Sequence, residues 1–240
     1  MNRKEFISKG LSILGFIGIG SFLGVFSPSL RNLFGVAKGR YQLGFFVDME
    51  KCVGCRACEA ACKQYYNLST DVRWRKVRAR EGGEFPDSGR VFMSLACNHC
   101  ERPACEKVCP VGAYHKRRKD GIVLHDKDKC IGCKYCTWAC PYQVPQFEKT
   151  TKKVHKCELC ATRLDRSQRP MCVSVCPTGA LDYGNVDKFS RIHEEVLREV
   201  PGFPDIAITS PTTRFRLPKK QYSHMKRIID KDVDKREQPI

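Results

Sequence analysis

The chain has 240 residues, 16 of them cysteine, and a formal net charge of +17. A chain of this length usually makes one or two domains. Disulfide-rich frameworks are typical of secreted chains shorter than about 100 residues, so they do not explain this cysteine content. Covalently attached haem is excluded because no C-x-x-C pair is followed by His.

The first 40 residues predict an export signal or a membrane anchor. Arg3, Lys4 and Lys9 precede an uncharged, largely apolar stretch at residues 10–30, which is the form of an export signal. Residues 2–7 resemble the twin-arginine export motif, with Lys4 in place of the second arginine. No convincing cleavage site follows, and 21 uncharged residues are long enough to span a bilayer, so an uncleaved anchor stays open. We expect a periplasmic location or one at the extracytoplasmic face of the cytoplasmic membrane.

Four groups of four cysteines come next. The groups are Cys52, Cys55, Cys58 and Cys62; Cys97, Cys100, Cys105 and Cys109; Cys130, Cys133, Cys136 and Cys140; and Cys157, Cys160, Cys172 and Cys176. The first and third have the C-x2-C-x2-C-x3-C spacing of bacterial ferredoxins, and proline follows the last cysteine of the second, third and fourth groups. Structural zinc uses separated C-x2-C pairs and has no use for a third cysteine two residues on. The spacing predicts four [4Fe-4S] clusters.

Cluster binding also bears on the charge of the protein. Each oxidised cluster with its four thiolates is negatively charged, so four clusters would offset about half of the basic excess. The remainder hints at an acidic partner or surface.

The segments beside the cysteine groups predict an internal duplication. Short apolar strands at residues 44–48 and 121–126 lead into the first and third groups. Matching segments at residues 109–114 and 176–181 leave the second and fourth groups. A compact hairpin with a basic turn at residues 116–120 would therefore join the second group to the third.

This duplication favours a nested pairing of the groups. In two-cluster ferredoxins the fourth cysteine of each group binds the cluster of the other group, so paired groups must lie close together. The second and third groups form one contiguous unit. The strands beside the first and fourth groups can pair in the same way, but the whole contiguous unit takes the place of the turn between them. The second unit would then enclose the contiguous unit in sequence. A tandem alternative pairs the first group with the second and the third with the fourth, but the 34 residues between Cys62 and Cys97 show no ferredoxin-like hairpin.

The nested pairing gives a fold class, domain bounds and four ligand sets. We expect an α+β protein with an outer ferredoxin-like domain at residues 41–92 and 153–186 and an inner one at residues 93–152. Site 1 is Cys52, Cys55, Cys58 and Cys176; site 2 is Cys62, Cys157, Cys160 and Cys172; site 3 is Cys97, Cys100, Cys105 and Cys140; site 4 is Cys109, Cys130, Cys133 and Cys136.

Several other side chains receive a structural interpretation. The basic residues around Trp74 alternate as in a strand with one solvated face; they are Arg73, Arg75, Lys76, Arg78 and Arg80. No base-reading motif accompanies them. His99 and His155 are expected to donate or accept hydrogen bonds near the clusters or to lie exposed, because the cysteines already complete the ligand count. Tyr135 and Trp138 are expected to pack on a cluster.

The last part of the chain, residues 187–240, predicts an extended arm. Residues 187–200 have the pattern of a short amphipathic helix, residues 201–218 are rich in proline, and residues 219–237 are strongly charged. The arm has little apolar material for a core of its own, so we expect it to lie on a partner protein; solvated disorder is the alternative.

Residues 44–184 resemble the four-cluster iron–sulfur subunit of dimethyl sulfoxide reductase and its relatives, which include polysulfide, thiosulfate and tetrathionate reductases. The matching stretches are residues 44–48, 97–100, 130–136, 139–142, 156–160 and 176–181. The resemblance supports the nested pairing and implies a molybdopterin-containing catalytic subunit and a membrane quinone-reactive subunit as partners. Some members replace the third cysteine of the third group with Trp, but this chain keeps Cys136, so four [4Fe-4S] clusters are expected.

These observations predict an electron-transfer subunit of an anaerobic respiratory oxidoreductase. No triad, nucleotide-binding loop or open metal position indicates an active site, so we expect no catalytic residues, no small-molecule substrate and no other cofactor. Two alternatives stay open, an electron carrier for a periplasmic nitrite reductase and a freely diffusing polyferredoxin. A nucleic-acid-binding cluster protein is disfavoured by the export signal.

Overall fold

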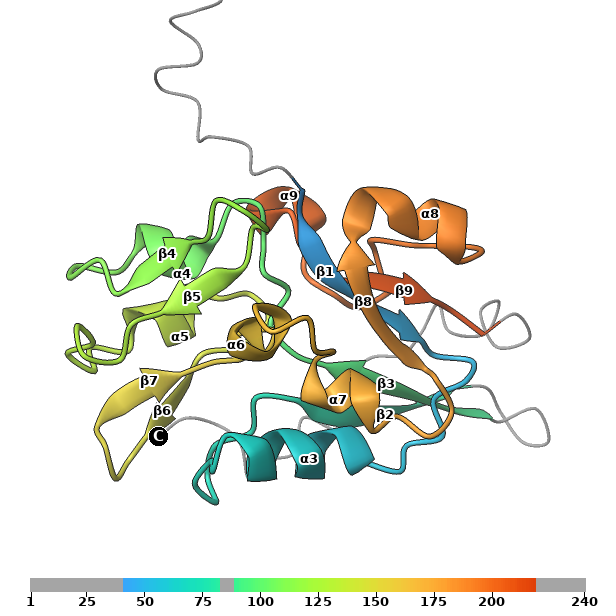
Figure 1. The fold of residues 1–240 in the computed structure, drawn as a ribbon, viewed down its shortest axis with the longest axis horizontal. Helices are drawn as coiled ribbons and strands as arrows, with labels where there is room; N and C mark the ends of the chain where they lie inside the picture. The colour runs from blue at the N-terminus through green and yellow to red at the C-terminus, as the bar shows by residue number, and fades with distance from the viewer. Residues whose placement is uncertain (1–40, 83–88, 219–240) are drawn as a thin grey trace, which may run out of the picture. The chain divides into compact units, whose positions relative to one another are not determined.

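The computed structural model describes residues 41–82 and 89–218, in which short strands and short helices alternate (Figure 1). The predicted export signal and the charged end of the chain lie outside these residues. Within the described part, no helix is long and apolar enough to cross a bilayer. Mixed helix and strand content confirms the α+β class.

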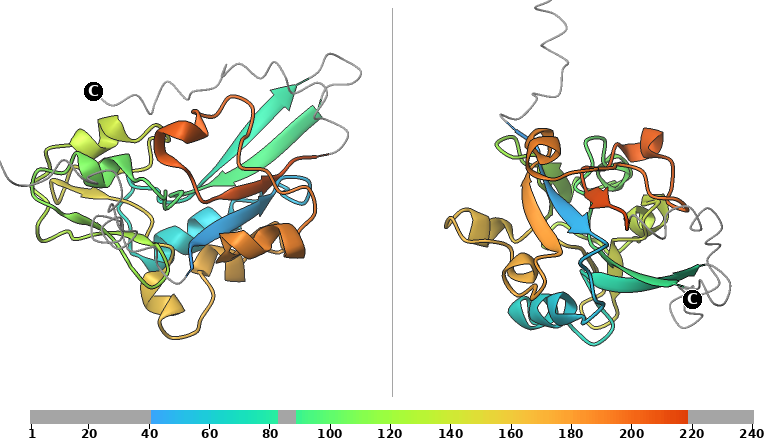
Figure 2. Two further views of the ribbon diagram at one scale, coloured as in Figure 1. Left: turned by 90° about the horizontal axis from the view of Figure 1, so that it is seen from above. Right: turned by 90° about the vertical axis from the view of Figure 1, so that its right-hand side faces the viewer.

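The outer unit is built on a sheet with the strand order β8–β1–β9, which Figure 2 shows side by side. Strand β1 (Leu43–Asp48) pairs antiparallel with β8 (Leu181–Asn185), so that Phe45 lies opposite Tyr183. The strand before the first cysteine group therefore pairs with the strand after the fourth, as the opened hairpin predicts. Two helices flank this pair, α3 (Ala57–Tyr65) and α7 (Met171–Ser174).

The inner unit contains the contiguous hairpin that the sequence predicts. Strand β4 (Tyr114–Lys116) pairs antiparallel with β5 (Val123–His125), and helices α4 (Ala104–Lys107) and α5 (Tyr135–Ala139) accompany it. The turn between the strands is closed by backbone hydrogen bonds from Arg117 N to Ile122 O and from Gly121 N to Arg117 O, both 2.8 Å long. Gly121 has φ +70°, a conformation that favours glycine.

Two further hairpins were not predicted. Strand β2 (Lys76–Gly82) pairs with β3 (Gly89–Leu95) in the stretch between the first two cysteine groups. This hairpin does not begin directly after Cys62, so it differs from the ferredoxin-like form that was expected to be absent there. Strand β6 (Gln146–Glu148) pairs with β7 (Lys153–His155), and α6 (Ala161–Leu164) follows. The domain boundary predicted between residues 152 and 153 lies inside this second hairpin.

The described part of the predicted arm is not detached from the rest of the protein. Strand β9 (Arg214–Arg216) adds to the free edge of β1 in parallel, with Val47 opposite Phe215. Residues 187–200 do not form one amphipathic helix; the structure has a 3-10 turn (Val186–Lys188) and α8 (Phe189–Ile192), and α9 (Ile206–Thr209) follows.

The apolar residues of this segment explain why it packs. Phe189, Val200, Phe215 and Leu217 are buried against the outer unit, although their spacing follows neither the helix nor the strand period. By pairing with β1, the segment also covers a sheet edge that would otherwise expose unpaired backbone groups. The expected arm is therefore part of the fold as far as residue 218.

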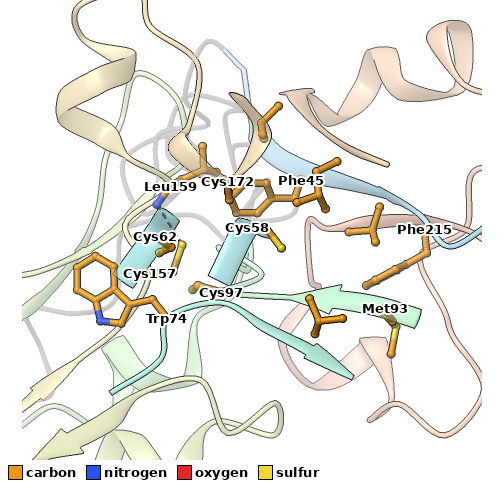
Figure 3. Packing of buried hydrophobic residues seen from close by; sticks show 14 of the residues in the cluster. Phe45, Cys58, Cys62, Trp74, Met93, Cys97, Cys157, Leu159, Cys172 and Phe215 are labelled. Atoms are coloured by element: carbon orange, nitrogen blue, oxygen red, sulfur yellow. Dashed lines mark hydrogen bonds between the residues drawn. The ribbon is translucent and has the colours of Figure 1, made fainter. Parts of the chain in front are cut away.

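The main core lies between the sheet, α3 and the β2–β3 hairpin, and cysteines form part of it (Figure 3). Phe45, Met93 and Phe215 are buried together with cysteines of the first, second and fourth groups. A smaller core in the inner unit surrounds Tyr114 and Cys136. The thiol groups thus point inward from several chain segments at once.

Candidate iron-sulfur sites

The loops of the first and third groups have the same backbone conformation at matching positions. Gly54 and Gly132, one residue before the second cysteine of each group, have φ +72° and +71°. Arg56 and Lys134, one residue after that cysteine, have φ +59° and +64° and precede α3 and α5. These left-handed residues turn the chain so that three successive cysteines face the same side. The duplication in sequence is therefore a duplication in structure.

Glycine is required at one of these positions by a close backbone approach. A Cβ atom added to Gly132 would lie 2.2 Å from the carbonyl oxygen of Lys152, well inside van der Waals contact. The left-handed φ adds conformational strain for any other residue. The loop of the third group is thereby packed tightly against the β6–β7 hairpin.

Site 1 collects thiols from both ends of the outer unit. Cys52, Cys55, Cys58 and Cys176 line one cavity together with residues of the β1–α3 and α7–β8 connections. The pKa of the Cys52 thiol is raised, first by burial and then by the negative potential of Cys58, Cys176 and Cys55. The structure therefore brings together the four residues that the nested pairing assigns to this site.

Site 2 lies deeper in the same unit. Burial raises the pKa of Cys62 to about 12, with Cys172 and Cys160 as further causes. The pKa of Cys157 is raised well above its ordinary value by burial and by neighbours that include Cys62 and Cys172. All four thiols of the predicted set are therefore neighbours, although they come from α3, the segment before α6, and α7.

Site 3 joins the second and third groups within the inner unit. Burial raises the pKa of Cys105, and it raises the pKa of Cys140 to about 11. The nearby Cys97 thiol contributes to both increases. Burial also raises the pKa of Cys100 to about 12, with Cys97 and Cys140 as its thiol neighbours. The four predicted ligands of site 3 are therefore close together.

Site 4 lies around α5. Cys130 and Cys133 raise the pKa of Cys136, after burial, which is the largest cause. Cys109 and Cys130 pack against the small core that contains Cys136 and Tyr114. The backbone N–H of Ala113 donates to the Cys109 sulfur at 3.3 Å. This set is assembled from the α4 and α5 segments of the inner unit.

Electrostatic contacts connect neighbouring sites. Cys58 of site 1 raises the pKa of Cys62 in site 2, and Cys97 of site 3 raises that of Cys157 in site 2. Tyr114 lies between sites 3 and 4, since Cys136, Cys105 and Cys97 all raise its pKa. Site 1 therefore borders site 2, site 2 borders site 3, and Tyr114 lies close to thiols of both site 3 and site 4.

The donor set fits iron–sulfur clusters. All 16 cysteines are free of disulfide bonds although they lie in groups of neighbours. Burial and mutual repulsion oppose ionisation of such thiols, and a positively charged iron centre is what would hold four of them as thiolates. Backbone N–H groups of His99 and Leu159 donate to the sulfurs of Cys97 and Cys157, both at 3.4 Å, as is usual around clusters of this kind. Within the described residues, no three His, Cys, Asp or Glu are arranged to hold a single metal ion.

The structure shows how several side chains around the sites compare with what the sequence patterns predicted for them. Arg75 is buried rather than solvated, and Lys156 is buried beside Cys157. His99 agrees with one of the two expectations for it, because it is buried and its Nδ1 accepts a hydrogen bond from Val123 N at 3.2 Å. Tyr135 and Trp138 are largely exposed, with ring centroids 6.0 Å apart, in contrast to the packing predicted for them.

The C-terminal segment contributes to site 3. Thr209 is buried, and its side chain lies near the Cys100 thiol and lowers the pKa of that thiol. Backbone hydrogen bonds from Arg102 N to Thr209 O and from Glu101 N to Ser210 O hold the segment against the second cysteine group. Nothing in the sequence around Thr209 indicates this contact, because the two partners are more than 100 residues apart.

Comparison with known proteins supports the same identification. Two families described as 4Fe-4S dicluster domains match residues 51–113 and 89–186. One chain of the anaerobic dimethyl sulfoxide reductase from Escherichia coli is 42% identical over 178 residues, which cover 71% of this chain and 86% of that protein. One subunit of the sulfite dehydrogenase from Allochromatium vinosum is 39% identical over 183 residues (68% and 76%), and Protein NrfC from E. coli is 35% identical over 222 residues (91% and 96%).

The two dicluster domains together account for four clusters and for all 16 cysteines. With the extent of the match to the reductase chain, they establish both the family and its role. The protein belongs to the iron–sulfur subunits of the dimethyl sulfoxide reductase family and transfers electrons through four [4Fe-4S] clusters.

Proposed function

We propose that the four ligand sets of the nested pairing hold the clusters, and that electrons pass along the series from site 1 to site 4 or in reverse. The observation that carries this proposal is the set of thiol neighbours, which joins Cys176 to Cys52 and Cys140 to Cys97. When bound, a [4Fe-4S] cluster accepts and donates one electron at a time. The chain supplies the ligands, the spacing between sites and the polar groups that set each potential.

Each end of the series meets a different partner subunit in this proposal. Site 1 lies near the surface, where Cys55 is exposed and the Val53 side chain is 60% exposed. Beside site 4, Ile131 is 64% exposed and Trp138 is 70% exposed. Trp138 is paired there with the exposed ring of Tyr135, with centroids 6.0 Å apart. Contiguous exposed apolar patches mark docking sites, and Trp is enriched among the residues that dominate binding energy.

The partners are a molybdopterin-containing catalytic subunit and a membrane subunit that reacts with quinone or quinol. Sulfite dehydrogenase and dimethyl sulfoxide reductase are the enzymes named for two relatives, and both names describe parts of larger oxidoreductases. This chain has no substrate-binding motif of its own, so substrate chemistry belongs to the catalytic partner.

We also propose that the complex lies at the extracytoplasmic face of the cytoplasmic membrane. The basic segment and the apolar stretch at residues 10–30 support export, and clusters assembled inside the cell require a route that moves folded proteins. The signal is either removed or kept as an anchor.

Purification from the membrane fraction tests the proposed assembly. We expect the chain to co-purify with a molybdenum-containing subunit and an integral membrane subunit, and to carry about 16 iron and about 16 sulfide per polypeptide. A chain that carries its clusters but co-purifies with no large subunit would instead be a diffusing polyferredoxin. Co-purification with a nitrite reductase would favour the other alternative, and zinc in place of iron would contradict both the ligand sets and the function.

A further inference from the structure

Arg75 is a fully buried cation immediately before β2. Its side chain is among the largest in the core, and the residue is only 2% exposed. The guanidinium Nη1 donates to Ser94 Oγ at 3.0 Å and to Ser94 O at 3.4 Å, and Cζ lies 4.3 Å from the centroid of the Phe45 ring. The second terminal nitrogen, Nη2, has no hydrogen-bond partner among the described residues.

A buried guanidinium requires a compensating negative group, because an isolated charge in a protein interior is strongly unfavourable. No carboxylate forms an ion pair with Arg75 in the part of the chain that the structure describes. The groups that stabilise its charge are thiols, with Cys172 and Cys157 of site 2 first, followed by Cys58 of site 1. Arg75 therefore lies where the fields of two cluster sites overlap.

Ser94 connects the guanidinium to site 1. Its hydroxyl oxygen accepts the hydrogen bond from Arg75 and lies 3.4 Å from the sulfur of Cys58. Since the oxygen is the acceptor toward Arg75, the hydroxyl proton is available to point at Cys58, where it would donate to a thiolate. Ser94 is itself buried, so water does not compete for this contact.

We propose that Arg75 sets the reduction potentials of both outer clusters, those of sites 1 and 2, and that Ser94 transmits part of its effect to site 1 alone. The proposal rests on the ligand sets proposed above. Reduction adds one electron to a site, and a fixed positive charge in a low-dielectric interior stabilises the more negative, reduced state. The guanidinium does not titrate, so the added electron is compensated without uptake of a proton. Arg75 thus raises both potentials and acts as a tuning residue rather than as a ligand.

The inner clusters have a different buried cation. Lys156 Nζ donates to the backbone carbonyl oxygens of Val123 and Cys157, and its charge affects Cys105 of site 3. The groups that shift the pKa of Cys136 in site 4 are Tyr114 and the thiols of the same site, and Arg75 is not among them. We therefore expect changes at Arg75 to leave the potential of site 4 unchanged.

Redox titration of the purified complex, followed by electron paramagnetic resonance, tests the proposal. In Arg75→Met, two of the four clusters should become harder to reduce by about tenfold or more in the reduction equilibrium, which is about 59 mV for a one-electron couple. Arg75→Lys keeps the charge, so the potentials should stay near those of the wild type. Arg73→Met is the matched control, because Arg73 is two residues away and exposed, and it should shift none of the four.

Ser94→Ala separates the two outer sites. We expect it to lower the potential of one cluster only, and that cluster should be the one whose signal is altered in Cys176→Ser. If Ser94→Ala and Cys176→Ser affect different clusters, the ligand assignment fails rather than the role of Arg75.

Measured iron content decides how the arginine variants are interpreted. Unchanged potentials in a fully loaded Arg75→Met complex would overturn the proposal, as would an Arg75→Lys complex with both outer potentials lowered as far as in Arg75→Met. If Arg75→Met assembles with less iron, Ser94→Ala and Arg75→Lys decide the question. The proposal is supported if Ser94→Ala lowers the potential of site 1 and Arg75→Lys keeps wild-type potentials. It is contradicted if all four potentials are unchanged in Ser94→Ala.

Discussion

The outer and inner units share one strand pairing but close it in different ways. In the inner unit, β4 and β5 are joined by a short turn and pair over three residues. In the outer unit, β1 and β8 are separated by the whole inner unit and pair over five residues. The outer pair also gains β9 as a third strand and the largest of the hydrophobic cores in the described residues.

This difference shows how a discontinuous unit is stabilised. Loop-closure entropy grows with the logarithm of loop length, so bringing β1 to β8 costs about 3 kcal/mol more than closing the inner turn. Full burial of one side chain such as Phe45 or Val47 contributes roughly 1.5–3 kcal/mol. Two buried side chains therefore offset the extra closure cost. The outer unit depends on tertiary packing, whereas the inner unit depends more on local chain geometry.

The largest expected effect comes from removing the cysteine that links the two ends of the outer unit. In Cys176→Ser, anaerobic alkylation with mass spectrometry should label Cys52, Cys55 and Cys58, while Cys130 and its neighbours stay protected. Complete loss of that cluster would lower the iron content by about a quarter.

The matched change in the inner unit is Cys140→Ser, the fourth cysteine of its own group. It should expose Cys97, Cys100 and Cys105 instead. Labelling of Cys130, Cys133 and Cys136 in Cys176→Ser would show that the groups pair in tandem.

Removal of a core side chain from β9 should weaken the outer unit. Phe215 is 2% exposed and its ring packs edge-on against Phe203, with centroids 5.6 Å apart. Phe215→Ala should cost about 3–5 kcal/mol of stability, which lowers the Tm by roughly 10 °C for a chain of this size. Thermal loss of cluster absorbance measures the change. Ile208→Ala, at a position that is 56% exposed, is the control, and equal shifts in both variants would mean that β9 is not part of the fold.

Acid should act on the inner unit through its buried histidines, His99 and His125, and His125 is the one tested here. Burial, followed by the charge of Lys156, lowers the pKa of His125 from 6.5 to about 4. Between those values the folded protein keeps His125 neutral while the unfolded protein takes up a proton, so stability falls as the pH decreases from 6.5 toward 4. The slope from this residue is at most about 1.4 kcal/mol per pH unit.

The slope is checked by measuring the free energy of unfolding of the wild type and of two histidine variants. The two pH values are about 7.5 and about 5, on either side of the ordinary histidine pKa. His125→Phe keeps the packing against Tyr114, whose ring centroid is 4.5 Å away, and should lose less stability in acid than the wild type. His115→Gln changes an exposed histidine on the neighbouring strand and serves as the control. An unchanged pH dependence in His125→Phe would show that His125 does not carry the effect.

The smallest effect on stability should come from Trp138, at the exposed flank of the inner unit. Trp138→Ala should change the unfolding free energy of the protein by less than about 0.5 kcal/mol. It should weaken assembly with the partner subunit by about 2 kcal/mol, or roughly 30-fold in Kd, if the residue lies at the centre of the interface.

Titration calorimetry or co-purification yield measures that loss. Ile192→Ala removes an equally exposed apolar side chain from α8 in the outer unit and should leave both quantities unchanged. Normal assembly of Trp138→Ala would contradict the docking of a partner beside site 4.

The sequence predicted those features that depend on local chemistry. Cysteine spacing is fixed by the shape of a cluster and by the few backbone turns that present three thiols to it, so the number and kind of cofactors followed directly. The strands beside each group are short and apolar, and glycines such as Gly54 and Gly132 stand where the loop turns left-handed. Both hairpins of the nested pairing could be inferred from these signals.

The rest was missed because it depends on residues that meet only in the folded protein. Arg75 lies in a basic, alternating stretch that is typical of a solvated strand face, and nothing near it in sequence supplies its partners Ser94 and Cys172. The β2–β3 hairpin was obscured by the same charges. Phe215 and Thr209 belong to a segment without hydrophobic periodicity. Phe215 is positioned by pairing with the free edge of β1, and Thr209 is positioned by its contact with site 3.

The sequence by itself determined that this protein holds four [4Fe-4S] clusters and is a member of an electron-transfer family, because ligand identity and spacing are encoded within a few residues. Tertiary structure decided the addition of β9 to the outer sheet, the position of Thr209 at site 3 and the burial of Arg75 between two sites. These properties depend on contacts between distant segments, whose free energy comes from burial and from charges placed in a low-dielectric interior.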